Sequence, residues 1–568
     1  MSLLETRTLL DEPHHDGSEL YVDGEDVRVL VPVDVDALAL RYVEDGEARA
    51  VRAEPDGEGW WRARLPRTNP VMRYRWLLSG GEVGYAWLNG AGLVRHDVPD
   101  ADDFVATTDP PGPDWHLRSV VYEIFPDRFA TTGAGGDPPD WAVPRAWHQP
   151  PTGRGPETPY EWFGGDLPGI EAHLDHIEAL GANVIYLTPI FPAGSTHRYD
   201  ATTFDRVDPL LGGDAALASL TRAAHVRGMR VVSDLTPNHT GHKHEWFVNG
   251  ERDLYLFDES GDYEAWWGIK TLPKLNWKSE ELRRRLQGVA QKWLQEPYSL
   301  DGWRVDVANM SGRTGETDVN ADVAPTLREA LEGDSLLVAE HFHDYRPDFR
   351  GWHGVMNYAG FSRPVWAWLR GDVDLQYFEL PIPMPRFAAD ASVATMRAFR
   401  AGVPWDFVLH SWAILDSHDS PRFRTLAGSE ERQLVGVGLQ MTTPGVPMVF
   451  AGDELGLEGE WGEDARRTMP WDSPRPPLFE HYRRLVALRR SSEALARGGI
   501  RYAYVDADVI AYLRETGDER LLCLASRAPH DPVRLPFTSL ETLYGADAED
   551  GVLPADGPSF HIWRINDG

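Results

Sequence analysis

The sequence predicts a multidomain protein built around a (β/α)8 TIM barrel with a small inserted lobe, preceded by a β-sandwich and followed by an antiparallel β domain. Two changes of pattern along the 568 residues indicate this division. Residues 1–112 and 495–568 consist of short strand-like runs, whereas residues 116–490 alternate strand-like runs with helical periodicity. Strands that alternate with helices are typical of a parallel sheet, and eight of them are typical of a closed barrel.

The first domain, residues 1–112, is predicted to be a β-sandwich. The alternating runs VRVLVPV (27–33) and MRYRWLL (72–78) fit half-buried strands, and DGEG (56–59) is a turn cluster. The run TTDPPGPDW (107–115) is rich in proline and glycine, which predicts a linker into the next domain.

Eight apolar runs between residues 116 and 490 are predicted to be the barrel strands. They lie at 120–125, 183–189, 229–235, 302–308, 336–342, 354–360, 413–419 and 447–454. Apolar residues near helical spacing at 170–180 and 217–226 predict the helices on either side of the second strand. The segment 240–276 is too long for an ordinary loop between a strand and a helix, so we expect a small lobe over the barrel mouth.

The last domain, residues 495–568, returns to strand-like runs at 500–514 and 520–526. These runs predict a small antiparallel β domain.

The amino-acid composition argues against some classes of binding partner. The formal net charge of −33 repels phosphate backbones and anionic lipid, which argues against nucleic acid and membrane partners. The single cysteine, Cys523, allows no internal disulfide, and the N-terminal residues lack the basic and apolar pattern of a secretory signal. We therefore expect a cytoplasmic protein.

Charged side chains follow several predicted barrel strands. In a barrel of this type the active site lies at the carboxyl ends of the strands. Polar residues there are Asp234, His239, Arg304, Asp306, Glu340, His418 and Asp419. Retaining glycosidases use one carboxylate as nucleophile and one protonated carboxyl as acid, about 5–5.5 Å apart. We expect Arg304 to hold Asp306 ionised, and neighbouring carboxylates with partial burial to raise the pKa of Glu340.

Four segments resemble, in order, the sequence motifs of the α-amylase superfamily, glycoside hydrolase family 13. They are DLTPNH (234–239), GWRVDVAN (302–309), VAEHFHD (338–344) and SHD (417–419). The resemblance implies that Asp306 is the nucleophile, Glu340 the acid/base and Asp419 the stabiliser of the transition state.

The segment LPKLN (272–276) is similar to a motif of the neopullulanase, cyclomaltodextrinase and maltogenic amylase subgroup. That resemblance implies oligosaccharide or cyclodextrin substrates. It also implies an N-terminal carbohydrate-binding module that can build a homodimer. The residues that it implies for substrate binding are Tyr199, Asp200, His239, Arg304, His418 and Arg467.

Several positions depart from the subgroup's pattern. Met310 replaces a glutamate on the acceptor side, His341–Phe342 replaces Ile–Trp, and Asp416 replaces a small residue. No cofactor is expected to be required. Relatives often bind calcium after the first strand; the oxygen donors available here are Asp137, Asp166 and the carbonyl of Gly164, few for an ion that takes six to eight ligands.

The resulting hypothesis is a hydrolase of α-1,4 bonds, with α-1,6 bonds as a second target, in cyclodextrins, cyclic or linear maltooligosaccharides or pullulan. Two alternatives stay open. A glucan transferase or sugar isomerase would share Asp306 and Glu340, and a non-catalytic homologue would bind sugar without turnover.

Overall fold

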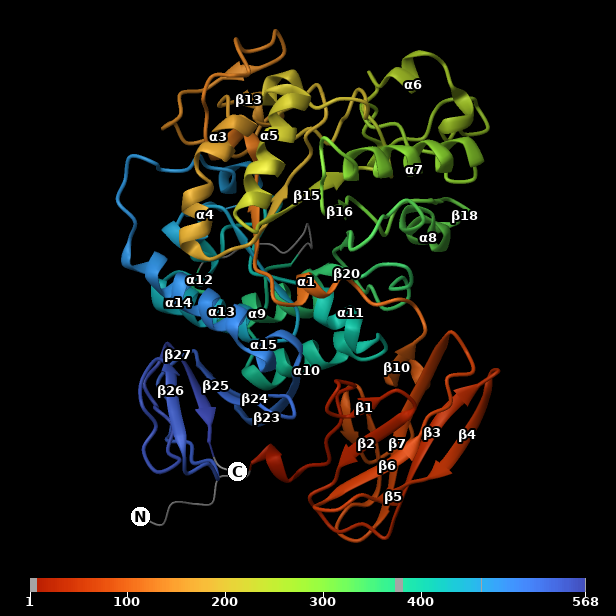
Figure 1. The fold of residues 1–568 in the computed structure, drawn as a ribbon, viewed down its shortest axis with the longest axis vertical. Helices are drawn as coiled ribbons and strands as arrows, with labels where there is room; N and C mark the ends of the chain where they lie inside the picture. Colours follow the sequence, from red (N-terminus) through yellow and green to blue (C-terminus); the bar gives the residue numbers. More distant parts are fainter. Residues whose placement is uncertain (1–7, 373–381, 461, 567–568) are drawn as a thin grey trace.

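The computed structural model describes residues 8–372, 382–460 and 462–566. The predictions for the first and last domains also cover residues 1–7 and 567–568, which lie outside this range. Figure 1 shows the barrel in the upper part of the molecule, with the N-terminal sheets and the C-terminal sheet below it. Among the described residues, no helix combines the length and apolar character needed to cross a bilayer.

Two antiparallel sheets form the N-terminal region. The smaller has the order β1 (Val22–Asp23), β2 (Asp26–Leu30), β6 (Trp60–Arg64), β5 (Glu54–Pro55). The larger has the order β4 (Glu47–Arg52), β3 (Ala37–Glu44), β7 (Val71–Gly80), β8 (Gly84–Asn89), β9 (Gly92–Val94), with β10 (Phe104–Thr107) paired to β7. Val29, Leu40, Trp76 and Leu78 are fully buried between the sheets, which confirms the predicted sandwich.

Eight parallel strands close into the barrel, as predicted. They are β11 (Val121–Ile124), β14 (Val184–Leu187), β15 (Arg230–Leu235), β16 (Gly302–Val305), β19 (Leu336–His341), β20 (Gly354–Asn357), β21 (Trp412–Ile414) and β22 (Val446–Phe450). The seventh strand is shorter than predicted, because the backbone N–H of Ser417 donates to the Ser420 hydroxyl at 2.9 Å and turns the chain out of the sheet. Asp419 therefore lies on a loop after the strand.

Helices surround the barrel and bury apolar side chains against it. In α7 (Glu280–Leu294), Leu282, Leu286, Val289 and Trp293 are buried at helical spacing, and Ser279 caps the first turn. The other longer helices are α5 (Gly213–Val226), α10 (Ala389–Arg400), α13 (Glu430–Thr442) and α14 (Pro477–Ser491). The shorter helices are α1 (Asp114–Leu117), α2 (Pro126–Phe129), α3 (Leu167–Ala172), α4 (Leu174–Leu180), α6 (Glu245–Val248), α8 (Val323–Arg328), α9 (Arg363–Leu369), α11 (Trp405–His410), α12 (Phe423–Ala427) and α15 (Glu493–Arg497). Both predicted helical segments are thus helical, with 170–180 spanning the end of α3 and all of α4.

The predicted lobe at 240–276 has little regular structure beyond α6 and two single 3₁₀ turns. Isolated backbone bridges, His239 to Lys274 and Tyr255 to Leu275, hold its two ends together. This pairing explains how a long insertion keeps a fixed shape.

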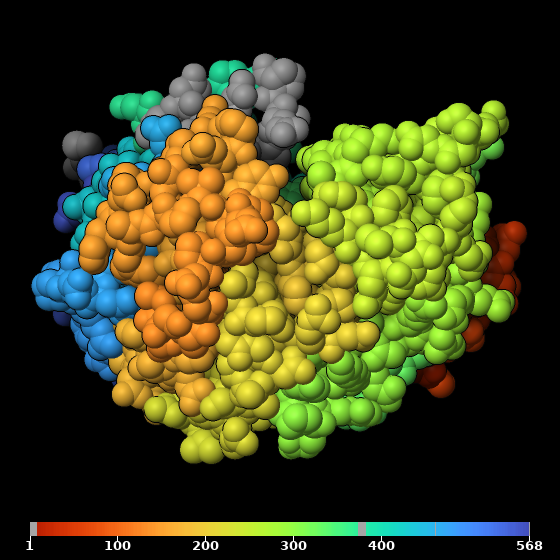
Figure 2. Space-filling model, turned by 90° about the horizontal axis from the view of Figure 1, so that it is seen from above, coloured from red at the N-terminus to blue at the C-terminus, as the bar shows by residue number. Residues whose placement is uncertain are grey.

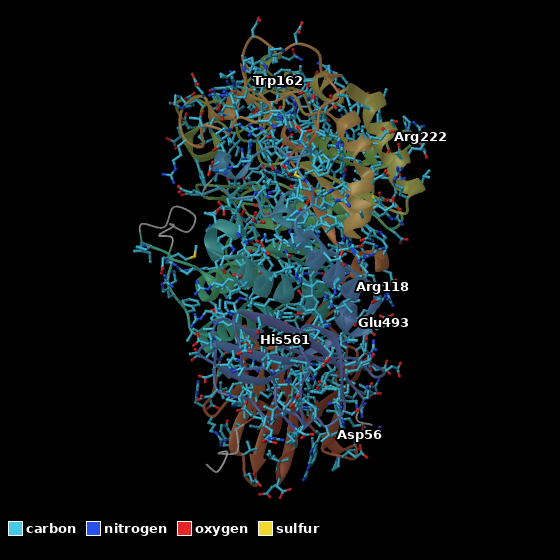
Figure 3. All side chains as sticks on the ribbon, turned by 90° about the vertical axis from the view of Figure 1, so that its left-hand side faces the viewer. Asp56, Arg118, Trp162, Arg222, Glu493 and His561 are labelled. Atoms are coloured by element: carbon cyan, nitrogen blue, oxygen red, sulfur yellow. The ribbon has the colours of Figure 1, made fainter. Side chains whose placement is uncertain are left out.

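The C-terminal sheet has the order β23 (Gly499–Asp506), β24 (Val509–Glu515), β25 (Arg520–Ser526), β27 (Ser559–Ile565), β26 (Leu540–Tyr544), and all its pairings are antiparallel, as predicted. An ion pair between Arg118, beside the first barrel strand, and Glu493 of α15 joins the two ends of the barrel region (Figure 3).

Candidate active site

A cleft of about 770 Å³ opens at the carboxyl ends of the barrel strands. Asp306, Glu340 and Asp419 all line it. One wall carries Trp141 and Tyr160, and the opposite wall carries aromatic residues of the lobe, Trp266 and Trp267. Figure 2 shows the hollow between these two walls, drawn in orange and yellow-green. The volume lies in the range of ligand-binding pockets.

Arg304 is the centre of the candidate site. It lies on β16 two residues before Asp306, so both side chains face the same side of the strand. Its Nη1 donates to Asp306 Oδ1 at 3.0 Å and to Asp234 Oδ2 at 2.8 Å. Its Nη2 lies 2.6 Å from Glu340 Oε1. One buried guanidinium thus holds three acidic side chains from three neighbouring strands.

Glu340 is fixed through its second oxygen as well. The backbone N–H of Val307 donates to Glu340 Oε2 at 2.7 Å. Val307 has φ +45°, a left-handed conformation that is an outlier for a β-branched residue. In contrast, Asp306 Oδ2 is buried with no hydrogen-bond partner among the described residues. An oxygen left free in a cleft is available to a ligand.

Asp419 is held by two cations. His418 Nε2 lies 3.1 Å from Asp419 Oδ2, and Arg466 Nη2 donates to Asp419 Oδ1 at 3.1 Å. The Tyr199 hydroxyl lies 2.7 Å from the same histidine nitrogen. Burial alone would raise the pKa of Asp419, but the charge and hydrogen bond of His418 outweigh it and lower the pKa below its usual range.

The two central carboxyl groups behave as one titrating pair. Burial raises the pKa of Glu340, with Arg304 opposing and Asp419 adding to the rise. Burial and the charge of Glu340 raise the pKa of Asp306 as well, against Arg304. Arg304 lowers the pKa of Asp306, as predicted, but burial and the charge of Glu340 oppose this effect. Two such groups retain one proton between them, which gives one charged and one neutral carboxyl.

The other predicted substrate-binding residues differ in their surroundings. His239 lines the cleft, stacks on Trp266 at 5.2 Å, and has a buried Nε2 atom without a partner among the described residues. Asp200 lines the cleft too, but it accepts from the Gly194 N–H at 3.1 Å and from the Ser195 hydroxyl. Its carboxylate therefore stabilises a turn of its own chain segment.

The placement of Arg467 requires a correction. Its guanidinium pairs with Asp464 at 2.9 Å, three residues earlier, and Arg467 is absent from the cleft lining. Arg466 lines the cleft and donates to Asp419 and to the His418 carbonyl. A short 3₁₀ turn, Gly462–Ala465, directly precedes the pair and fixes which of the two side chains points inward.

Sequence reasoning missed Glu123. This residue lies in β11, is fully buried, and contacts His418 Nδ1 at 2.5 Å. A signal was present: a lone acid inside the apolar run VVYEIF (120–125). Lys274 of the LPKLN segment is also buried, and its Nζ donates to the Met310 carbonyl at 3.2 Å, so it supports the loop after β16.

The candidate calcium ligands do not fit a cation. Asp166 caps α3, with Oδ1 accepting from the Gly169 N–H at 2.7 Å. Its Oδ2 accepts from the Thr132 and Ala134 N–H groups at 2.9 and 3.1 Å. Asp137 is exposed. A carboxylate already surrounded by N–H donors is a capping group, so this donor set lacks the oxygens that calcium requires.

Comparison with known proteins agrees with this geometry. Residues 123–357 match the family model of the alpha amylase catalytic domain. A cyclomaltodextrinase from Geobacillus thermopakistaniensis is 32% identical over 500 residues, which cover 83% of this chain and 80% of that protein. The ligand-free cyclic alpha-maltosyl-(1→6)-maltose hydrolase from Arthrobacter globiformis superposes with a TM-score of 0.67 at 31% identity, covering 80% of this chain and all of that one. The type III pullulan hydrolase from Thermococcus kodakarensis has a TM-score of 0.74 at 25% identity, with coverage of 97% and 99%.

The barrel and the carboxyl pair on one arginine, taken with these similarities, define an enzyme of the glycoside hydrolase class. The chain belongs to the α-amylase family.

Proposed function

We propose that this protein is a retaining α-glycoside hydrolase that cleaves α-1,4 bonds, and α-1,6 bonds as a second target, by double displacement. The observation that carries the proposal is the contact of one guanidinium, Arg304, with both Asp306 and Glu340. This contact keeps the two carboxyl groups on one side of the same cleft, where a single sugar ring can meet both.

The proposed course gives each carboxyl group one role. Glu340 protonates the glycosidic oxygen while Asp306 attacks the anomeric carbon through its free Oδ2. Glu340 then takes a proton from water, which releases the sugar from Asp306. Asp419, kept ionised by His418 and Arg466, accepts hydrogen bonds from sugar hydroxyls that strengthen in the transition state.

The reacting sugar is proposed to lie against Tyr199 and His239. Arg304 and His418, which are fully buried, are proposed to act on it through the carboxyl groups that they contact. Tyr199 and His239 line the cleft, and the partnerless His239 Nε2 is an unused polar group for a sugar hydroxyl. We assign the role expected for Arg467 to Arg466, because Arg466 contacts Asp419.

The proposed substrates are cyclodextrins, cyclic or linear maltooligosaccharides and pullulan. The names of the similar proteins support this class: cyclomaltodextrinase, cyclic alpha-maltosyl-(1→6)-maltose hydrolase and pullulan hydrolase. Aromatic side chains on both walls of the cleft supply the flat apolar surfaces that stack on sugar rings.

The wider setting is proposed as follows. The chain divides into domains at residues 1–112, 116–490 and 495–568. It works in the cytoplasm and requires no calcium. It forms a homodimer through its N-terminal domain. The name of a relative, the intracellular maltogenic amylase of Bacillus subtilis, supports the location. The N–H donors around Asp166 support independence from calcium. Analytical ultracentrifugation of the full chain and of a chain starting at residue 113 tests the dimer.

A substrate panel tests the function. kcat/KM is measured on β-cyclodextrin, pullulan, panose, maltotriose and a cyclic α-1,4/α-1,6 tetrasaccharide, and early products are followed by proton NMR. The α-anomer is expected first, and a β-anomer would remove the retaining mechanism. Accumulation of longer sugars at high substrate concentration, with little free glucose, would instead identify a transferase.

A further inference from the structure

His418 lies between two carboxylates inside the barrel. Its Nδ1 is 2.5 Å from Glu123 Oε1, and its Nε2 is 3.1 Å from Asp419 Oδ2. Glu123 is two residues after Val121, a residue of the lumen cluster, so its side chain points into the barrel. Tyr122, between them, points outward and bonds Glu454 at 2.8 Å. Glu123 therefore contacts His418 from within the barrel, on the side away from the cleft.

Counting protons fixes the state of this histidine. A neutral imidazole carries one N–H and can donate to one acceptor only. A lone pair on Nε2 would face Asp419 Oδ2, which can only accept, at 3.1 Å. The Tyr199 hydroxyl donates to Asp234 Oδ2 at 2.9 Å and, with its proton there, accepts from Nε2 at 2.7 Å. Each ring nitrogen of His418 then faces acceptors alone, and both nitrogens must carry a proton.

We propose that Glu123 is a positioning residue that, together with Asp419, keeps His418 as an imidazolium ion beside the reacting sugar. The catalytic part of this inference rests on the proposed function, whereas the protonation state does not. Burial by itself would lower the pKa of His418, but the charges of Asp419 and Glu123 raise it to about 10. A permanent cation beside Asp419 explains why that carboxylate stays ionised although it is only partly exposed.

The other charged groups around the ring do not replace Glu123. Arg466 donates to the His418 carbonyl at 2.7 Å, and its positive charge opposes protonation of the ring. His197 is neutral at working pH, because burial lowers its pKa to about 3. Asp234 already accepts from Arg304 and Tyr199. Glu123 is therefore the one anion that contacts Nδ1 among the described residues.

Glu123→Gln removes the charge and keeps the shape of the side chain. We expect the pKa of His418 to fall from about 10 by about two to three units toward 6.5. Loss of the Glu340 proton lowers kcat on the alkaline limb of the pH profile in both enzymes, and loss of the His418 proton should lower it further, at a lower pH, in the variant. Near pH 9, kcat should be about tenfold to a hundredfold below wild type, the size of one lost charge-assisted hydrogen bond. Near pH 6 the two enzymes should agree within about threefold, because the ring is protonated in both.

Glu454→Gln is the matched control. Glu454 is also buried and also contacts a histidine, His176, at 2.8 Å, but neither residue lines the cleft. This variant should keep the wild-type alkaline limb. An unchanged limb in a folded Glu123→Gln enzyme overturns the proposal, and so does an equal shift in Glu454→Gln.

If Glu123→Gln fails to fold, the protonation state of His418 can be measured on the wild-type protein. Nitrogen-15 NMR of histidine-labelled protein, with His418→Gln used to assign the signal, should show both ring nitrogens protonated at pH 8. A neutral tautomer overturns the inference. This readout needs no substrate, so an enzyme that turns over none of the α-glucans refutes the proposed function while the charge of His418 is still decided.

Discussion

Arg304 contacts Asp306 through Nη1 at 3.0 Å and Glu340 through Nη2 at 2.6 Å. A single positive charge thus faces two carboxyl groups, and the pair keeps one proton. When Glu340 gives its proton to the leaving group, Asp306 becomes an ester, so the negative charge of the pair moves from Asp306 to Glu340 and stays next to the same guanidinium. The arginine thereby stabilises the pair before and after proton transfer.

Replacing either carboxyl group with an amide should stop turnover. We expect Asp306→Asn and Glu340→Gln each to lower kcat by more than about a thousandfold, since the members of a catalytic unit are not replaceable one at a time. Binding of β-cyclodextrin, measured by calorimetry, should persist in both. Asp322→Asn is the control, because Asp322 pairs with Arg283 at 2.9 Å outside the cleft and should retain full activity. Substantial kcat in Asp306→Asn would contradict the assignment of the nucleophile.

Substitution of Trp267 should weaken substrate binding without lowering the stability of the protein. It has φ +48°, is 66% exposed and stacks on Trp266 at 4.6 Å. Asparagine tolerates a left-handed backbone better than tryptophan, so Trp267→Asn should leave the free energy of unfolding unchanged or raise it by up to about 1 kcal/mol. Loss of the ring should raise KM for maltoheptaose about fivefold to tenfold, with kcat within about twofold.

Val248→Asn is the control for Trp267. Val248 belongs to the same lobe and is 68% exposed, but it does not line the cleft. It should change neither KM nor kcat. A Trp267→Asn enzyme with wild-type KM would show that the ring has no part in binding.

Asp416, which departs from the subgroup's pattern, should make stability depend on pH. Burial and the charge of Asp453 raise its pKa well above 3.8, and the two carboxyl groups share a hydrogen bond. Because the pKa of Asp416 is raised in the folded protein, its contribution to the free energy of unfolding is fully present below about pH 3.8. This contribution is lost as the pH rises through the pKa of the folded protein. Asp416→Asn keeps a hydrogen bond without needing a proton. Its unfolding free energy minus that of wild type should therefore increase by about 1 kcal/mol or more from pH 5 to pH 9, measured by urea titration. The exposed Asp334→Asn should show a flat difference.

Calcium should not affect this protein through residues 130–166. Asp166→Asn should lower stability by about 1 kcal/mol, because asparagine keeps an oxygen for the Gly169 N–H but turns an NH2 group toward the Thr132 and Ala134 N–H groups. Neither 5 mM calcium nor a chelator should shift the melting temperature of wild type by more than about 1 °C, because Asp166 has no free oxygen to offer. A calcium-dependent rise that disappears in Asp166→Asn would restore the metal site.

The barrel strands could be predicted because each is a short apolar run bounded by turn residues, and the central site residues because they follow such strands. The features that could not be predicted from the sequence also have physical reasons. Arg466 and Arg467 are adjacent and chemically identical, so only the turn before them decides which one faces the cleft. Glu123 and His418 are 295 residues apart, and no periodicity connects them. The shared proton of Asp306 and Glu340 depends on complete burial, which residue spacing does not reveal.

The walls of the cleft come from Trp141 and Tyr160 on one side and from Trp266 and Trp267 on the other, segments that add no strand to the barrel. None of these four residues is an acid, and none contacts Arg304. Libraries confined to residues 141–160 and 266–272 could therefore retarget the enzyme to sugars of other length or branching while its acid and nucleophile stay untouched. Recognition and bond cleavage are separable in this molecule, which makes its rim a starting point for engineering.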